Sequence, residues 1–210
     1  MSRLLVATEN RGKLAEYRRL LAPLRAEVLG TQELDLHLAV PEPHATYAAN
    51  ATDKAVAHAR ASGLVTVADD SGIEAAALGW GPGVTSARFA AADGRAGADL
   101  LLERLADATD RRARMVCWLA VAVPDVKGGE PAVELFEGIV DGTITHDRRG
   151  SGGFGYDPIF ELAGGRTTAE LADQDKDRLS HRGRAVRAAL PRLRELLAAQ
   201  ARMGRTAEDA

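Results

Sequence analysis

The sequence predicts an α/β fold, because short apolar runs alternate with segments that have helical periodicity. The chain begins with a predicted short buried strand at residues 3–7, a polar loop and a helical pattern over residues 13–21. An alanine-rich helix is expected over residues 47–62, with Gly63 as its C-cap. Nine successive apolar residues at 115–123 predict a strand that is covered on both faces.

The remaining elements are expected in the following order. A weak strand is predicted at 27–29 and a loop at 34–46. Strands are predicted at 65–68 and 73–78, with a turn at Ser71-Gly72 between them. A loop at 79–83 and a helix at 98–106 follow. The strand at 115–123 pairs in a long hairpin with residues 135–145. A final helix follows Ser180, and Pro191 is expected to kink or break it.

Composition limits the classes of protein to consider. The 210 residues are 46% hydrophobic and 27% charged, which is typical of a soluble globular protein. We expect one domain over residues 1–201 and a flexible tail over 202–210. The net charge of −3 gives no reason to expect a nucleic-acid or membrane partner. A single cysteine, Cys117, is consistent with a reducing cytoplasm.

Two adjacent acids, Asp69 and Asp70, follow the apolar run at 65–68. Neighbouring side chains of a strand point to opposite sides, so at a strand end one acid can face a cleft. Mg²⁺ prefers one or two carboxylates together with phosphate oxygens, and a carboxylate can also deprotonate a water molecule. A plainer alternative is an Asx-turn made by Asp70 with Ser71-Gly72, and the residues alone do not separate the two.

The loop at residues 8–13, TENRGK, lies between the first strand and the first helix. Backbone N–H groups at a helix N-terminus bind anions, and Lys13 adds a positive charge. The spacing is not that of a P-loop, and an ordinary capped turn is the alternative. Asn50 and Lys54 share one face of the next helix, and Glu42 precedes it.

The segment SGGFGYDPIF, residues 151–160, sets aromatic rings among glycines. Phe154 and Tyr156 offer flat faces on which a base can stack, and Asp157 offers an acceptor; a tight turn with core aromatics is the alternative. His181 and Arg182, near a helix start, can donate to a base carbonyl or a phosphate. Together these features predict a site for a nucleoside polyphosphate.

The chain resembles the noncanonical purine nucleoside triphosphate pyrophosphatases, also called inosine triphosphatases or XTP/dITP diphosphatases, the Ham1-like family. The resemblance rests on LLVATENRGKLAEYRRLL, NATDKA, VADDSGIEAAALGWGPGVTSARFA, GTITHDRRGSGGFGYDPIF and TTAELADQDKDRLSHRGRA, which come in the family's order. It implies an elongated two-lobed α/β fold on a long mixed β-sheet flanked by helices, with a nucleotide cleft between the lobes. It also implies a homodimer and Mg²⁺-dependent hydrolysis of ITP, dITP and XTP to the monophosphate and pyrophosphate.

The resemblance also implies roles for individual residues. Asp70 would be the general base and a metal ligand, supported by Asp69. The triphosphate would be held by Thr8, Glu9, Asn10, Arg11, Gly12, Lys13 and Lys54. Ser71 would lie near the substrate. The purine would be held by Phe154, Gly155, Tyr156, Asp157, Lys176, His181 and Arg182. The chain has Pro41 and Ala49 where the family often has acids, so Glu42 is our third candidate ligand for Mg²⁺.

Three other functions were weighed against this one. A related pyrophosphatase would act on modified pyrimidine or methylated nucleotides. A binding protein would hold ITP without turnover, because acids are missing near Glu42. A purely structural α/β domain would leave the assembled motifs without a role.

Overall fold

The computed structural model describes residues 2–89, 96–125 and 127–208, with side chains up to residue 202. The chain forms two compact units that each draw on separate segments. Unit 1 contains Met1–Asp70, Trp118–Phe136 and Ala185–Ala210, and unit 2 contains Ser71–Cys117 and Glu137–Arg184. The chain therefore passes from one unit to the other between Asp70 and Ser71.

The strands form a mixed sheet in the order β2-β1-β3-β5-β6-β7, with β4 paired to β3. Their bounds are β1 Arg3–Val6, β2 Glu27–Gly30, β3 Val65–Ala75, β4 Gly81–Pro82, β5 Arg112–Val123, β6 Ala132–Ile144 and β7 Phe160–Glu161. β1 runs parallel to β2 and β3, whereas β4 and β7 pair antiparallel with β3 and β6. This confirms the predicted α/β fold with a mixed sheet and helices around it.

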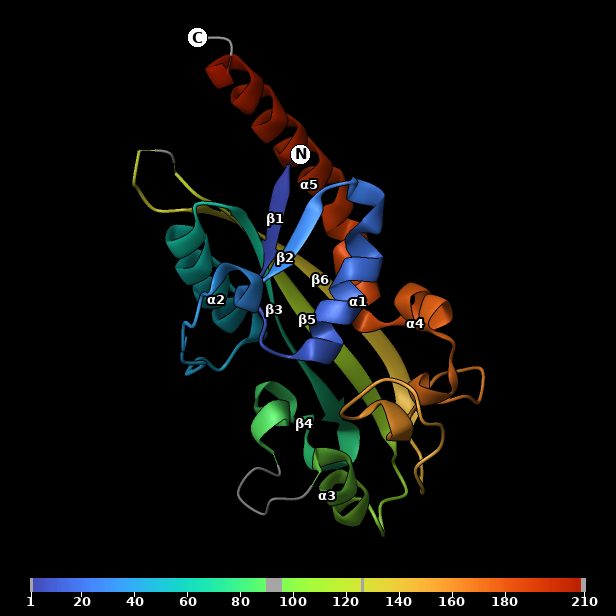
Figure 1. Ribbon diagram of the computed structural model, residues 1–210. Coiled ribbons are helices and arrows are strands. Elements are labelled where there is room, and N and C mark those ends of the chain that lie inside the picture. Colours follow the sequence, from blue (N-terminus) through green and yellow to red (C-terminus); the bar gives the residue numbers. More distant parts are fainter. Residues whose placement is uncertain (1, 90–95, 126, 209–210) are drawn as a thin grey trace. The chain divides into compact units, whose positions relative to one another are not determined.

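Three long helices belong wholly or mostly to unit 1, namely α1 Arg11–Leu21, α2 Tyr47–Ser62 and α5 His181–Glu208. In Figure 1, α1 and α2 lie on opposite sides of strands β1 to β3. Ala51, Ala55 and Ala59 of α2 are fully buried against alanines of the strands, including Ala68 and Ala120. Such small side chains let the helix approach the sheet closely, so α2 is held firmly beside β3.

Unit 2 has the shorter helices α3 Gly97–Arg104 and α4 Asp173–Leu179. Its core contains Ile73, Leu101, Leu105 and Phe160, all fully buried. Leu101 lies on α3, and Ile73 lies on the half of β3 that belongs to this unit. The core of unit 2 therefore fixes the part of β3 that follows the two acids.

The structure corrects several sequence predictions. The strands predicted at 65–68 and 73–78 are joined in one continuous strand, β3, so no turn occurs at Ser71-Gly72 and the Asx-turn alternative is wrong. β3 ends at Ala75, and Ala76–Leu78, which were predicted as strand, form a 3₁₀ helix. β3 continues because its second half gains a new partner, β4, within the segment predicted as a loop at 79–83. Pro191 lies inside α5 without ending it. α4 was not predicted.

Other predictions were confirmed or stay open. α2 has the predicted bounds, and Gly63 follows it with φ = 67°. β5 and β6 are neighbours in the sheet, as the predicted hairpin requires. α5 continues to Glu208, and Asp209 and Ala210 lie outside the described residues, so the flexible tail stays a prediction.

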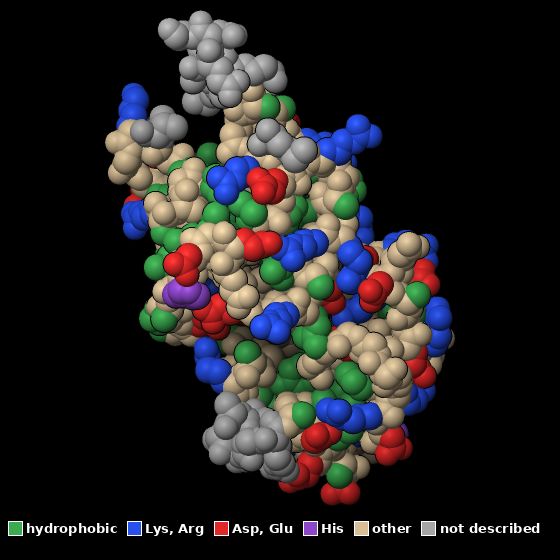
Figure 2. All heavy atoms as spheres, viewed as in Figure 1, with side chains coloured by type: hydrophobic (Ala, Val, Ile, Leu, Met, Phe, Trp, Pro, Cys, Tyr) green, Lys and Arg blue, Asp and Glu red, His purple; other side chains and the backbone are tan. Residues whose placement is uncertain are grey.

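The surface matches the near-balanced charge of the sequence. Figure 2 shows Lys and Arg side chains interspersed with Asp and Glu on the face it displays. Among the described residues, no helix combines the length and the apolar character needed to cross a membrane.

Candidate active site

Asp69 and Asp70 lie in the middle of β3, at the point where β3 stops pairing with β1. The last pair of that ladder joins Val6 to Val67. Asp69 is 2% exposed and Asp70 is 6% exposed. Buried carboxylates need charged or hydrogen-bonding partners to offset the loss of water. The chemical role of Asp69 and Asp70 therefore depends on which groups contact each carboxylate.

Two lysines from different helices contact Asp69. Lys13 Nζ of α1 lies 2.9 Å from Asp69 Oδ2. Lys54 Nζ of α2 donates to the backbone oxygen of Asp69 at 2.6 Å and to Glu42 Oε1 at 2.6 Å. Unit 1 thus brings together two lysines and the acids that the sequence assigned to phosphate and metal binding.

Asp70 has a different neighbour. Asn50 Nδ2 donates to Asp70 Oδ2 over 2.8 Å. Burial raises the pKa of the Asp70 carboxyl above its ordinary value, although the Asn50 hydrogen bond and the charge of Lys54 oppose the shift. The nearby charge of Glu42 raises the pKa further. A carboxylate with a raised pKa accepts a proton more readily, which suits a general base.

Sequence reasoning did not assign Asn50 to the site, although its side chain is fully buried. The available signal was its spacing from Lys54, because residues four apart on a helix share a face. That signal places Asn50 beside Lys54 but does not reveal the contact with Asp70. The contact depends on how α2 packs against β3.

The loop at residues 8–13 forms the N-terminus of α1. Asn10 is the N-cap, and its Oδ1 accepts from the Lys13 backbone N–H at 3.0 Å. Thr8 Oγ1 accepts from the Asn10 N–H at 3.2 Å. The first turn of α1 contains no acidic residue, so the positive end of the helix dipole is not offset there. The loop is a capped turn, as the alternative stated, and phosphate binding by it stays a prediction.

In unit 2, Asp157 organises the glycine-rich segment. Its Oδ2 accepts from the Phe154 backbone N–H at 2.7 Å and pairs with Lys176 Nζ at 2.6 Å. Its Oδ1 accepts from Thr168 Oγ1 at 2.8 Å. A Cβ added at Gly153, where φ is +69°, would collide with Asp157 and with Lys176 Nζ. Glycine is therefore required beside this buried ion pair.

Two cations lie near the Phe154 ring. Lys176 Nζ is 4.9 Å from the ring centroid, and Arg182 Cζ is 5.7 Å from it. Arg182 also donates to Ser71 Oγ at 3.1 Å. The structure thus groups Ser71, which was expected near the substrate, with Phe154, Lys176 and Arg182, which were assigned to the purine.

The other aromatic residue of this segment has a packing role. The Tyr156 ring packs against the core of unit 2, and its hydroxyl donates to the Ser86 backbone oxygen at 2.8 Å. Burial raises the pKa of the hydroxyl to about 12. Gly155 has φ = +60° with open space beside it. His181 is 8% exposed at the start of α5. Contact of these three residues with a purine stays a prediction.

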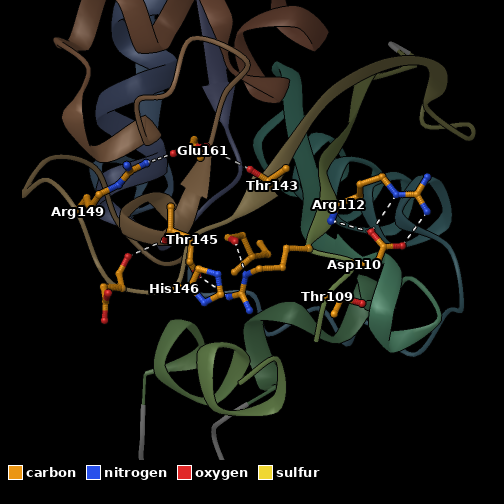
Figure 3. Close-up of a pocket in the computed structure, with 11 residues that line it drawn as sticks. Thr109, Asp110, Arg112, Thr143, Thr145, His146, Arg149 and Glu161 are labelled. Atoms are coloured by element: carbon orange, nitrogen blue, oxygen red, sulfur yellow. Dashed lines mark hydrogen bonds and ion pairs between the residues drawn. The ribbon is translucent and has the colours of Figure 1, made fainter. Parts of the chain in front are cut away.

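A separate pocket lies in unit 2 (Figure 3). It has a volume of about 590 Å³ and is lined by residues 109–112, 143–147, Arg149 and Glu161. Arg149 pairs with Glu161, and Arg112 lies 2.7 Å from Asp110. Hydrogen bonds from Arg112 lower the pKa of Asp110 to about 2. None of the site residues predicted from the sequence lines this pocket. Its charged side chains Asp110, Arg112, Arg149 and Glu161 are paired with one another.

The carboxylates around Asp70 are the candidate ligands for a metal ion. Among the described residues, His, Cys, Asp and Glu form no group of three or more that could hold a metal ion. Asp70 and Glu42 are nevertheless close enough for the charge of one to raise the pKa of the other. Mg²⁺ takes only one or two carboxylates when phosphate oxygens and water complete its shell. Asp70 and Glu42 supply that number of carboxylates, and Glu42 is paired with Lys54 just as Asp69 is paired with Lys13.

The chain is similar in sequence to proteins named dITP/XTP pyrophosphatase. A dITP/XTP pyrophosphatase of Streptomyces coelicolor is 45% identical over 204 residues, covering 94% of this chain and 100% of that protein. A dITP/XTP pyrophosphatase of Aromatoleum aromaticum is 47% identical over 196 residues, covering 91% of this chain and 96% of that protein.

Solved structures show the same relationship. The Ham1 protein of Staphylococcus aureus matches with a TM-score of 0.78 and 34% identity, covering 91% of this chain and 98% of that one. A nucleoside-triphosphatase / dITP/XTP pyrophosphatase of Mycobacterium abscessus matches with a TM-score of 0.65 and 42% identity, covering 90% and 99%. The model of the Ham1 family matches residues 4–192. The chain therefore belongs to the Ham1 family.

Proposed function

We propose that this chain hydrolyses noncanonical purine nucleoside triphosphates, namely ITP, dITP and XTP, to the monophosphate and pyrophosphate in the presence of Mg²⁺. The observation that carries the proposal is the buried Asp70 carboxylate beside a second acid and two lysines of unit 1. Relatives named dITP/XTP pyrophosphatase support the substrate class. Such an enzyme removes damaged purine nucleotides from the pool that polymerases use.

The residues of unit 1 bind the triphosphate in this proposal. Lys13 and Lys54 offset the negative charge of the phosphates, and the backbone N–H groups at the start of α1 bind phosphate oxygens. In the absence of nucleotide, the two lysines are occupied by Asp69 and Glu42. Substrate binding therefore exchanges contacts within the protein for contacts with phosphate.

Asp70 acts as the general base. It takes a proton from a water molecule as the water oxygen forms a bond to the α-phosphorus, and the bond from that phosphorus to the bridging oxygen breaks to release pyrophosphate. Asp70 and Glu42, with Asp69 nearby, would hold Mg²⁺, which would supply positive charge that stabilises the leaving pyrophosphate. Positioning and charge neutralisation then supply most of the rate enhancement.

The residues of unit 2 bind the purine. Its ring stacks on Phe154, and Lys176, His181 and Arg182 supply hydrogen-bond donors. Hypoxanthine and xanthine present a 6-oxo acceptor to such donors, whereas the 6-amino group of adenine would place donor against donor. A buried donor left without an acceptor costs enough to discriminate strongly between bases.

The proposal includes the organisation of the protein. In this proposal, residues 1–201 form a single functional domain, because one substrate needs both the triphosphate-binding and the purine-binding residues. Membership of the Ham1 family supports a homodimer. The lone buried cysteine, Cys117, is consistent with a cytoplasmic location.

A substrate panel tests the proposal. The purified chain is incubated with Mg²⁺ and, separately, ITP, XTP, dITP, ATP, GTP and dCTP, and released pyrophosphate is quantified. We expect kcat/KM for ITP, dITP and XTP to exceed that for ATP by about a hundredfold or more, because of the unpaired donor. Chelation of Mg²⁺ should abolish release. A kcat/KM for dCTP or ATP as high as that for ITP would contradict the proposed substrate class.

A further inference from the structure

A hydrogen-bonded network joins the loop before α2 to Asp70. Asn50 Nδ2 donates to Asp70 Oδ2 at 2.8 Å, and it also lies 3.4 Å from the backbone oxygen of His44. The His44 backbone N–H donates to Asn50 Oδ1 at 3.0 Å. All three residues belong to unit 1. The side-chain amide of Asn50 is thus hydrogen-bonded at both ends.

This network fixes the orientation of the Asn50 amide. A backbone N–H can only donate, so the atom that faces the His44 N–H must be the amide oxygen. The amide NH₂ group must then face Asp70. Because Asn50 is 0% exposed, water cannot substitute for either contact. The donor is therefore directed at the carboxylate before any substrate binds.

A second contact ties the same loop to α2. The His44 ring Nε2 lies 2.7 Å from Asp53 Oδ2, and Asp53 follows Asn50 by three residues on the helix. The two side chains are 42% and 50% exposed. His44 is therefore held by its backbone to Asn50 and by its ring to Asp53. We call this pair of contacts the His44 latch.

We infer that Asn50 is a positioning residue for Asp70, and that the His44 latch keeps the Asn50 amide in place. The inference rests on the proposed function, in which Asp70 is the general base. A general base must be held within a fraction of an ångström of its productive position. One hydrogen bond from a rigid, buried amide restricts the rotation of the Asp70 carboxylate and so fixes its direction.

The first test compares two substitutions of Asn50 in the full chain. Asn50→Ala removes both contacts, whereas Asn50→Asp keeps an acceptor for the His44 N–H but loses the donor to Asp70. With ITP and Mg²⁺, we expect both variants to lower kcat by at least about tenfold, since aligned proton transfer contributes more than that. Binding of ITP in the absence of divalent cation, measured by calorimetry, should change by less than about twofold because the phosphate-binding lysines are untouched.

A merely structural role would give a different pattern. If Asn50 only anchored the loop, Asn50→Ala would lower the thermal stability but retain the kcat of the wild type, and this result would overturn the inference. Thermal unfolding of each variant identifies any loss of fold. Thr52→Ala is the matched control on α2, because the Thr52 hydroxyl donates to its own helix, at the Ala48 backbone oxygen. It should retain the kcat of the wild type.

The latch is tested by a double-mutant cycle. His44→Ala and Asp53→Ala each remove the ring contact and leave the His44 backbone in place. We expect each to lower kcat by about threefold, and the double variant to lower it no further, because both remove one interaction. Unchanged or fully additive kcat values would contradict a role for the latch.

The wild-type reaction separates the inference from the proposed function. If the wild type releases pyrophosphate from ITP and both Asn50 variants keep its kcat, the inference is wrong and the proposed function stands. If the wild type binds ITP but releases no pyrophosphate, the proposed function is wrong and the inference fails with it.

Discussion

Replacing Asp70 by Asn is expected to lower kcat for pyrophosphate release by about a thousandfold, because the amide cannot accept a proton from water. The fold should remain intact, since Asn has the shape of Asp and its oxygen can still accept from Asn50. Burying an amide also avoids the cost of burying a charge. Initial rates with ITP, together with thermal unfolding, measure both expectations.

The matched control makes the same chemical change elsewhere in unit 1. Asp35 is 96% exposed, and its φ of 53° is one that Asn adopts readily. Asp35→Asn should therefore retain the activity and the stability of the wild type. Full activity in Asp70→Asn would show that another group is the base.

Replacing Lys176 by Met is expected to lower the free energy of unfolding by about 3–5 kcal/mol, the usual cost of removing one member of a buried ion pair. Lys176 and Asp157 side chains are each 5% exposed, so water cannot replace the lost partner. Asp157 would keep its bonds from Phe154 and Thr168 but carry an uncompensated charge. Denaturant unfolding measures the effect, and KM for ITP should rise in the variant that remains folded.

Arg178→Met is the matched control on the same helix. Arg178 pairs with Asp175 at 3.3 Å, and the two side chains are 73% and 45% exposed. Exposed ion pairs contribute less than about 1 kcal/mol, so little stability should be lost. Equal losses in the Lys176 and Arg178 variants would contradict the stabilising role assigned to the buried pair.

Local patterns were enough to predict much of the fold. α2 was predicted residue by residue, because an alanine-rich periodic segment ended by glycine has few alternative structures. β3 was divided wrongly at Ser71-Gly72, because Ser-Gly after an acid favours a turn when only local sequence is considered. The strand continues because its neighbours change along its length, from β1 at Val67 to β4 at Glu74. Pairing with distant segments is not visible in a local pattern.

In the candidate site, too, local sequence predicted some residues, and contacts between distant segments determined others. Lys13, Lys54 and the two acids could be assigned because each lies in a recognisable segment, and the structure brings them together in unit 1. Asn50 was not assigned, because its contact with Asp70 joins residues 20 apart through the packing of α2 on the sheet. The pocket in Figure 3 was not anticipated either, because its lining comes from separate strands and loops.

The position of bond cleavage tests the central claim most directly. The wild-type chain is incubated with ITP and Mg²⁺ in water labelled with ¹⁸O, and the products are analysed by mass spectrometry. We predict pyrophosphate without label and inosine monophosphate that carries one ¹⁸O atom, because water attacks the α-phosphorus. Labelled orthophosphate would place the attack at the γ-phosphorus, and labelled pyrophosphate would place it at the β-phosphorus; either result would contradict the account.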